Sequence, residues 1–185
     1  MFKRMLCLLG LWCLSSAVPA TAQPQSLRPM LARLRELKPL LGHRNWIVIA
    51  DSAYPLQIAP GIETIHADAD LLEVAAAVLS ELGSAPHVRP SIMIDAELEH
   101  VPERHAPGIE AYYAALRQLL AGREARALPH ERIIAQLDEA GKTFKVLIIK
   151  TRMALPYTSI FLELDCGYWS NDAERELRAA METGQ

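Results

Sequence analysis

The sequence has few cysteines and few aromatic residues. Three cysteines occur in 185 residues, and Cys7 and Cys13 lie in an N-terminal segment that we expect to be removed. Only Cys166 would then remain, so the mature chain has no intrachain disulfide and depends on packing. Aromatic residues make up 6% of the chain and the formal charge is −3, which argues against base stacking and against nucleic acid or an anionic membrane as a partner.

Several common functional motifs are also missing. The sequence contains no Gly-x-Gly-x-x-Gly and no phosphate-binding loop, so a bound nucleotide is not supported. It has no Gly-x-Ser-x-Gly elbow, which argues against a common class of hydrolases. His87, His100 and His105 lie near acidic residues, but their spacings match no known set of ligands. We therefore predict no metal site.

The first 22 residues are typical of a secretory signal peptide. Lys3 and Arg4 give a basic start, the apolar run 5–14 is too short to span a bilayer, and 20–22 reads Ala-Thr-Ala. We expect cleavage before Gln23, which leaves a single domain over 23–185, periplasmic or secreted and free of the membrane. A retained N-terminal anchor is the alternative.

Helical and strand patterns alternate along the rest of the chain. Apolar periodicity predicts helices over 26–41, 71–82, 108–120, 128–140 and 172–181, and strands over 46–50, 62–65, 91–96, 144–149 and 157–164. Asp68 or Asp70 could cap the helix that begins at Leu71. The alternation predicts an α/β fold with three layers, in which helices cover both faces of a mostly parallel sheet.

The central feature is the buried strand 46–50, which has a histidine before it and an aspartate after it. His43 follows Gly42 at the entrance, and Asp51 lies at the exit, the end at which α/β sheets tend to bind ligands. Eight residues of extended chain would hold the two Cα atoms roughly 26 Å apart. One active site can use both residues only if the chain bends sharply or if one of them serves a neighbouring subunit.

These residues resemble the ribose pyranase and fucose mutarotase family. The resemblance begins with Leu41-Gly42-His43, the apolar strand, Asp51 and Pro55, because the family has a Gly-His pair and an Asp at the same offset. It continues through Ile65-His66-Ala67-Asp68, which is similar to an Arg-Ala-Asp-Gly stretch of the fucose branch, and through Pro156–Ile160. It covers about residues 35–168.

The resemblance implies an isomerase that interconverts monosaccharide anomers or ring forms without a cofactor. It gives His43 the catalytic acid/base position, Asp51 that of a sugar-binding carboxylate, and Tyr157 that of a second proton-transfer or binding group. His130 and Ser159 take positions that contact the sugar. It also implies a ring-like homo-oligomer whose sites draw on adjacent subunits.

Three departures from the family leave an alternative open, and one of them is the loop 150–155, which is longer and differently charged than the family's. Thr158-Ser159 replaces the family's Gly-Asn or Ala-Asn, so Ser159 supplies a hydroxyl where the family has an amide. Family members are typically cytoplasmic, whereas we expect this chain to be exported. The alternative is a non-catalytic sugar-binding or assembly module on the same fold, possibly linked to transport. Tyr157 could likewise be an ordinary aromatic residue on an edge strand.

Overall fold

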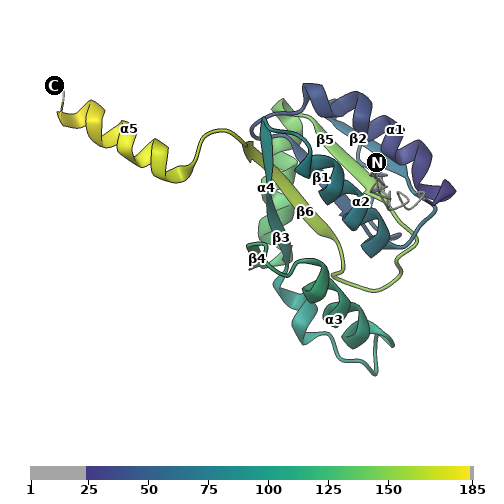
Figure 1. Ribbon diagram of the computed structural model, residues 1–185. Helices are drawn as coiled ribbons and strands as arrows, with labels where there is room; N and C mark the ends of the chain where they lie inside the picture. Colours follow the sequence, from purple (N-terminus) through teal and green to yellow (C-terminus); the bar gives the residue numbers. More distant parts are fainter. Residues whose placement is uncertain (1–23, 184–185) are drawn as a thin grey trace, which may run out of the picture.

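The computed structural model describes residues 24–183, which form a six-stranded mixed sheet with helices on both faces (Figure 1). The strands are β1 (Trp46–Ala50), β2 (Ile62–His66), β3 (Val88–Asp95), β4 (Ala125–Leu128), β5 (Val146–Lys150) and β6 (Ile160–Cys166), in the order β2-β5-β1-β6-β3-β4. Only β6 runs against its neighbours, β1 and β3. The predicted α/β fold with a mostly parallel sheet is confirmed.

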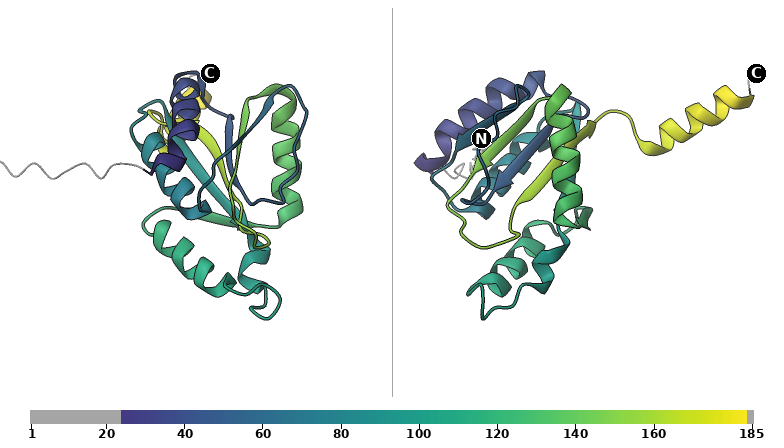
Figure 2. Two further views of the ribbon diagram at one scale, coloured as in Figure 1. Left: turned by 90° about the vertical axis from the view of Figure 1, so that its right-hand side faces the viewer. Right: turned by 180° about the vertical axis from the view of Figure 1, so that it is seen from behind.

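The helices divide the core into two layers. Helices α1 (Arg28–Leu37), α2 (Leu71–Gly83) and α3 (Ile109–Leu119) pack with one set of strand residues, which includes Ile47 and Ile49. Helix α4 (His130–Thr143) packs on the other face, against Trp46, Val48 and Ala50 (Figure 2). Every residue of β1 is therefore buried, as its continuous apolar run predicts.

Short 3-10 turns join several of these elements: η1 (Gln25–Leu27), η2 (Lys38–Leu40) and η3 (Ala96–His100). The first helix ends at Leu37, earlier than predicted, because Pro39 cannot continue the pattern of backbone donors and η2 follows instead. Asp70, rather than Asp68, caps α2: it accepts from the backbone N–H of Leu72 and forms a capping box with Glu73.

Two features differ from the sequence expectations. Strand β4 was not predicted, since Arg126 is exposed and the strand lies at the edge of the sheet. Helix α5 (Asn171–Thr183) was predicted, but it buries no residue and extends away from the sheet (Figure 1). No helix within residues 24–183 is long and apolar enough to cross a membrane. The predicted signal peptide, 1–22, lies outside the described residues.

Candidate functional site at the carboxyl edge of the sheet

The topology gathers several polar side chains where the parallel strands terminate, which we call the carboxyl edge of the sheet. The parallel strands β1, β3 and β5 end there, and the antiparallel strand β6 begins there, because Ile49 pairs with Ile160. This arrangement brings the segments that follow β1, β3 and β5 beside residues 157–159. The edge is the place where open α/β sheets bind ligands.

Asp51 and Ser159 are held together at this edge. The Ser159 hydroxyl donates to Asp51 Oδ2 at 2.9 Å and accepts from the Asp51 backbone N–H at 3.2 Å. The other carboxylate oxygen of Asp51 accepts from the N–H of Ala53 at 2.8 Å. Ser159 is buried, whereas Asp51 remains partly exposed. The carboxylate is therefore fixed in direction while part of it still faces solvent, as a group that binds a sugar hydroxyl requires.

The loop after β5 supports the Asp51 turn from the side. The Thr151 hydroxyl and backbone N–H both donate to the carbonyl of Ala50, each at 2.9 Å. The Ser52 N–H donates to the carbonyl of Met153 at 2.7 Å. Two loops that are 101 residues apart in sequence are thus joined by hydrogen bonds beside the carboxylate.

His130 begins α4 at the same edge and is held on two sides. Its backbone N–H donates to both carboxylate oxygens of Glu97, at 3.0 Å each. Its ring Nδ1 lies 3.1 Å from Oδ1 of Asp95, the last residue of β3. The ring also stands edge-on to the Tyr157 ring, with centroids 5.7 Å apart. His130 and Tyr157, two sequence candidates, are therefore neighbours.

Tyr157 occupies a strained backbone position. Its φ is 58°, in the left-handed region that bulky residues rarely adopt, and the side chain is 40% exposed. The next residue is anchored, because the buried Tyr112 hydroxyl donates to the carbonyl of Thr158 at 2.6 Å. Tyr157 also lines a pocket of about 330 Å³ together with Glu97 and His100. Strain of this kind is typical of functional sites.

Burial sets the electrostatics of this edge. It raises the pKa of Asp95 from 3.8 to about 6, against the opposing effect of His130. Nearby Glu97 and Asp51 raise the pKa of Asp95 further. Burial also raises the pKa of Tyr54, and the carboxylates of Asp138, Asp51 and Asp95 add to the effect. The edge thus combines one solvent-facing carboxylate, one buried carboxyl group and a histidine.

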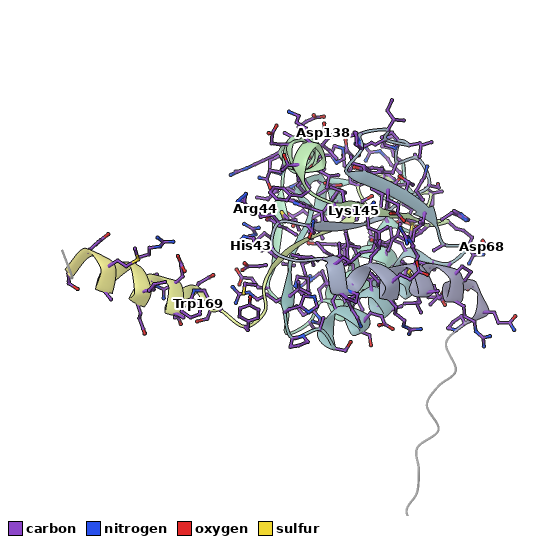
Figure 3. The ribbon with its side chains drawn as sticks, turned by 90° about the horizontal axis from the view of Figure 1, so that it is seen from above. His43, Arg44, Asp68, Asp138, Lys145 and Trp169 are labelled. Atoms are coloured by element: carbon purple, nitrogen blue, oxygen red, sulfur yellow. The ribbon has the colours of Figure 1, made fainter. Side chains whose placement is uncertain are left out.

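His43 does not lie at this edge. It belongs to the turn before β1, in which Asn45 Oδ1 accepts from the Gly42 N–H at 2.7 Å and Arg44 takes a φ of 70°. Its ring is 65% exposed, and Nδ1 lies 3.9 Å from Asp165 near the end of β6. Figure 3 shows His43 on the side from which Trp169 and α5 extend, while Asp68, after β2, lies on the far side.

The structure therefore brings together four of the five candidates: Asp51, His130, Tyr157 and Ser159. The fifth, His43, lies in a separate pocket of about 460 Å³ that Asp165 and Trp169 also line. Sequence reasoning missed Asp95, although the signal was the one that identified Asp51, an acid directly after an apolar strand. Among the described residues, no three His, Cys, Asp or Glu side chains cluster in a way that could hold a metal ion.

Comparison with solved structures identifies the fold. The chain superposes on Bacillus subtilis RbsD complexed with D-ribose with a TM-score of 0.51 and 20% identity, over 72% of this chain and 92% of that one. It superposes on Streptococcus pneumoniae fucose mutarotase in complex with L-fucose with a TM-score of 0.51 and 18% identity, over 79% and 98%. The chain has their fold. No protein-family model and no curated protein matches the sequence.

Proposed function

We propose that this chain is a sugar mutarotase or pyranase of the ribose pyranase and fucose mutarotase family. The observation that carries the proposal is the carboxyl edge, where Asp51, Ser159, His130 and Tyr157 lie together. A partly exposed carboxylate, an imidazole and a phenol suit a ring that carries several hydroxyls. The fold shared with a D-ribose complex and an L-fucose complex supports a monosaccharide as the ligand.

The proposed reaction opens and recloses a cyclic hemiacetal. The anomeric hydroxyl loses a proton, the ring oxygen gains one, and the bond between C1 and the ring oxygen breaks. Closure on the other face, or through another hydroxyl, gives the other anomer or ring size. Neither step changes an oxidation state or forms a carbanion, so proton transfer by groups that titrate near neutral pH is sufficient.

In this proposal His43 is a proton-transfer group that acts in a neighbouring copy. Within one copy, β1 separates His43 from Asp51, so His43 cannot reach a sugar bound at the carboxyl edge of its own chain. It is well exposed, as a side chain that completes another copy's site must be. The chain therefore assembles into a closed, ring-like oligomer whose sites lie where the two edges meet.

We propose that the protein lies in the periplasm or outside the cell, on the basis of the signal peptide predicted at 1–22. Intact mass of protein exported from its native host tests this placement. A chain that begins at Gln23 supports it, and a chain that retains Met1 argues against it.

Saturation-transfer NMR tests the activity. One anomeric proton of a sugar is saturated, and the loss of signal from the other anomer measures exchange. The test uses D-ribose, L-fucose and a panel of other pentoses and hexoses, with and without the protein. Accelerated exchange of at least one sugar supports the function. Binding without acceleration for every sugar would instead indicate a sugar-binding module.

A further inference from the structure

Asp95 is a buried carboxyl group to which the proposed reaction has so far given no role. It is 1% exposed and ends β3 on the face that α4 covers. Its Oδ1 lies 3.1 Å from Nδ1 of His130. Its Oδ2 is buried and has no hydrogen-bond partner among the described residues. Burying a carboxyl group in this way is costly, which calls for a functional reason.

His130 is held in a way that leaves only one ring nitrogen for a ligand. Glu97 fixes the backbone at the start of α4, and Asp95 occupies Nδ1. The ring is 34% exposed, and its neighbour Tyr157 is itself exposed. A neutral imidazole carries one proton, so an Nδ1–H that donates to Asp95 leaves the lone pair on Nε2.

We propose that Asp95 is a positioning residue that fixes His130 in the Nδ1–H tautomer, so that Nε2 of His130 exchanges a proton with the sugar. The proposal deepens the sugar-isomerase function and rests on it. His130 thereby changes from a group that only binds the sugar to one that takes part in the reaction. Asp95 acts through His130 and does not touch the sugar.

His130 and His43 are sufficient for both proton transfers of the proposed reaction. Nε2 of His130 takes the proton of the anomeric hydroxyl, and the O–H electron pair forms the C1 carbonyl. The bond between C1 and the ring oxygen breaks, and its electron pair stays on that oxygen. The oxygen takes a proton from protonated His43 of a neighbouring copy. Ring closure reverses both transfers, so each histidine regains its starting state.

The charged and titratable groups that face this pair come from several elements. Glu97 follows β3, Asp51 follows β1, and Tyr157 precedes β6. Asp51 and Glu97 both disfavour a charged Asp95, whereas His130 favours it. Above pH 6 Asp95 is ionised and accepts from Nδ1–H, which is the state the proposal requires. As the pH falls through about 6, Asp95 is protonated and this interaction is lost.

The decisive experiment reads the tautomer directly. Two-bond and three-bond ¹H–¹⁵N correlations of the full mature chain at pH 8 assign the protonated nitrogen of His130, with His130→Gln used to identify its signals. The proposal expects Nδ1–H in the wild type. In Asp95→Asn the side-chain amide can donate to Nδ1, so the population should move toward Nε2–H. A wild-type ring with the proton on Nε2 would overturn the proposal.

Kinetics then test whether the tautomer matters. Asp95→Asn should lower the rate of anomeric exchange at saturating sugar by about tenfold or more, with little change in KM, because acid/base groups contribute about 10² to 10⁴. It should also remove the part of the fall in rate that the protonation of Asp95 causes as the pH drops through about 6. Glu131→Gln is the matched control: it removes an exposed acid from the next residue of α4 and should leave rate and pH profile unchanged.

The outcomes separate this proposal from the function on which it rests. An active wild type whose rate and pH profile survive in Asp95→Asn overturns the role of Asp95 and leaves the isomerase function standing. An inactive wild type with every sugar overturns the isomerase function and the catalytic role of His130 with it, even where the Nδ1–H tautomer is found.

Discussion

His43 and Asp51 lie at opposite ends of strand β1, on opposite edges of the sheet. Asp51 is tied to Ser159 at the start of β6, while His43 lies beside Asp165 near its end. The five buried residues of β1 lie between them and pair along their whole length with β5, so the two side chains stand at opposite ends of the strand. A site that uses both therefore requires a second copy of the chain.

Assembly is the first consequence. We expect the mature chain to be a homo-oligomer at micromolar concentration. His43 of one copy and Asp51 of the same copy lie too far apart to share a site, so a complete site needs His43 from one copy and Asp51 from another. Light scattering coupled to size exclusion measures the mass. A monomer of about 18 kDa with full activity would contradict the shared site.

Ser159 is expected to support sugar binding through Asp51. Ser159→Ala removes the donor to Asp51 Oδ2 and the acceptor of the Asp51 N–H. Losing such buried interactions costs about 1–3 kcal/mol, so we expect a raised KM and lower stability. Ser91→Ala is the control, because Ser91 pairs with Glu163, away from the carboxyl edge, and bonds only Arg126 among the described side chains. Equal KM values for the two variants would show that the Ser159 hydroxyl does not position Asp51.

Asp95 is expected to make stability depend on pH. Its folded pKa of about 6 lies above the ordinary 3.8, so between these values the folded chain binds more protons than the unfolded chain. Stability therefore falls as pH rises through this window, by up to about 3 kcal/mol. Urea unfolding of wild type and Asp95→Asn at pH 4, 5, 6 and 7 measures it. The free energy of unfolding of Asp95→Asn, relative to that of the wild type, should increase as the pH rises. A difference in unfolding free energy that does not depend on pH would contradict the raised pKa of Asp95.

The sequence predicts the fold well where apolar residues dominate. The run Trp46–Ala50 reads as a buried strand, and both sides of it are indeed covered. It predicts β4 poorly, because an edge strand containing exposed Arg126 has no apolar pattern. It cannot give the direction of β6, since alternation of side chains is the same in parallel and antiparallel strands.

For the candidate site too, the sequence predicts some residues and misses others. Asp51, His130, Tyr157 and Ser159 were identified from sequence, and the structure places them at one edge. Asp95 was missed because the sequence places it inside the predicted strand 91–96, and only the position of α4 reveals that it is buried against His130. The eight-residue spacing did correctly anticipate the separation of His43 from Asp51.

His43 is expected to be required for catalysis but not for folding. His43→Ala should reduce anomeric exchange by about 10² to 10⁴, while its exposed ring contributes little packing. His105→Ala, another exposed histidine, serves as the control. Circular dichroism and thermal unfolding should be unchanged in both. A fully active His43→Ala would make Tyr157 the next residue to substitute.

Mixing two impaired variants tests the shared site most directly, with the sugar kept well below KM so that the weak sugar binding of Asp51→Asn lowers its rate. His43→Ala and Asp51→Asn are unfolded together and refolded as mixed oligomers, and anomeric exchange is measured by saturation-transfer NMR. Where the edges of two copies form one site, some sites contain an intact His43 and an intact Asp51. Random mixing of equal amounts should restore about a quarter of the wild-type rate. Mixed oligomers, verified by differently tagged subunits, that are no faster than either variant alone would contradict the shared site.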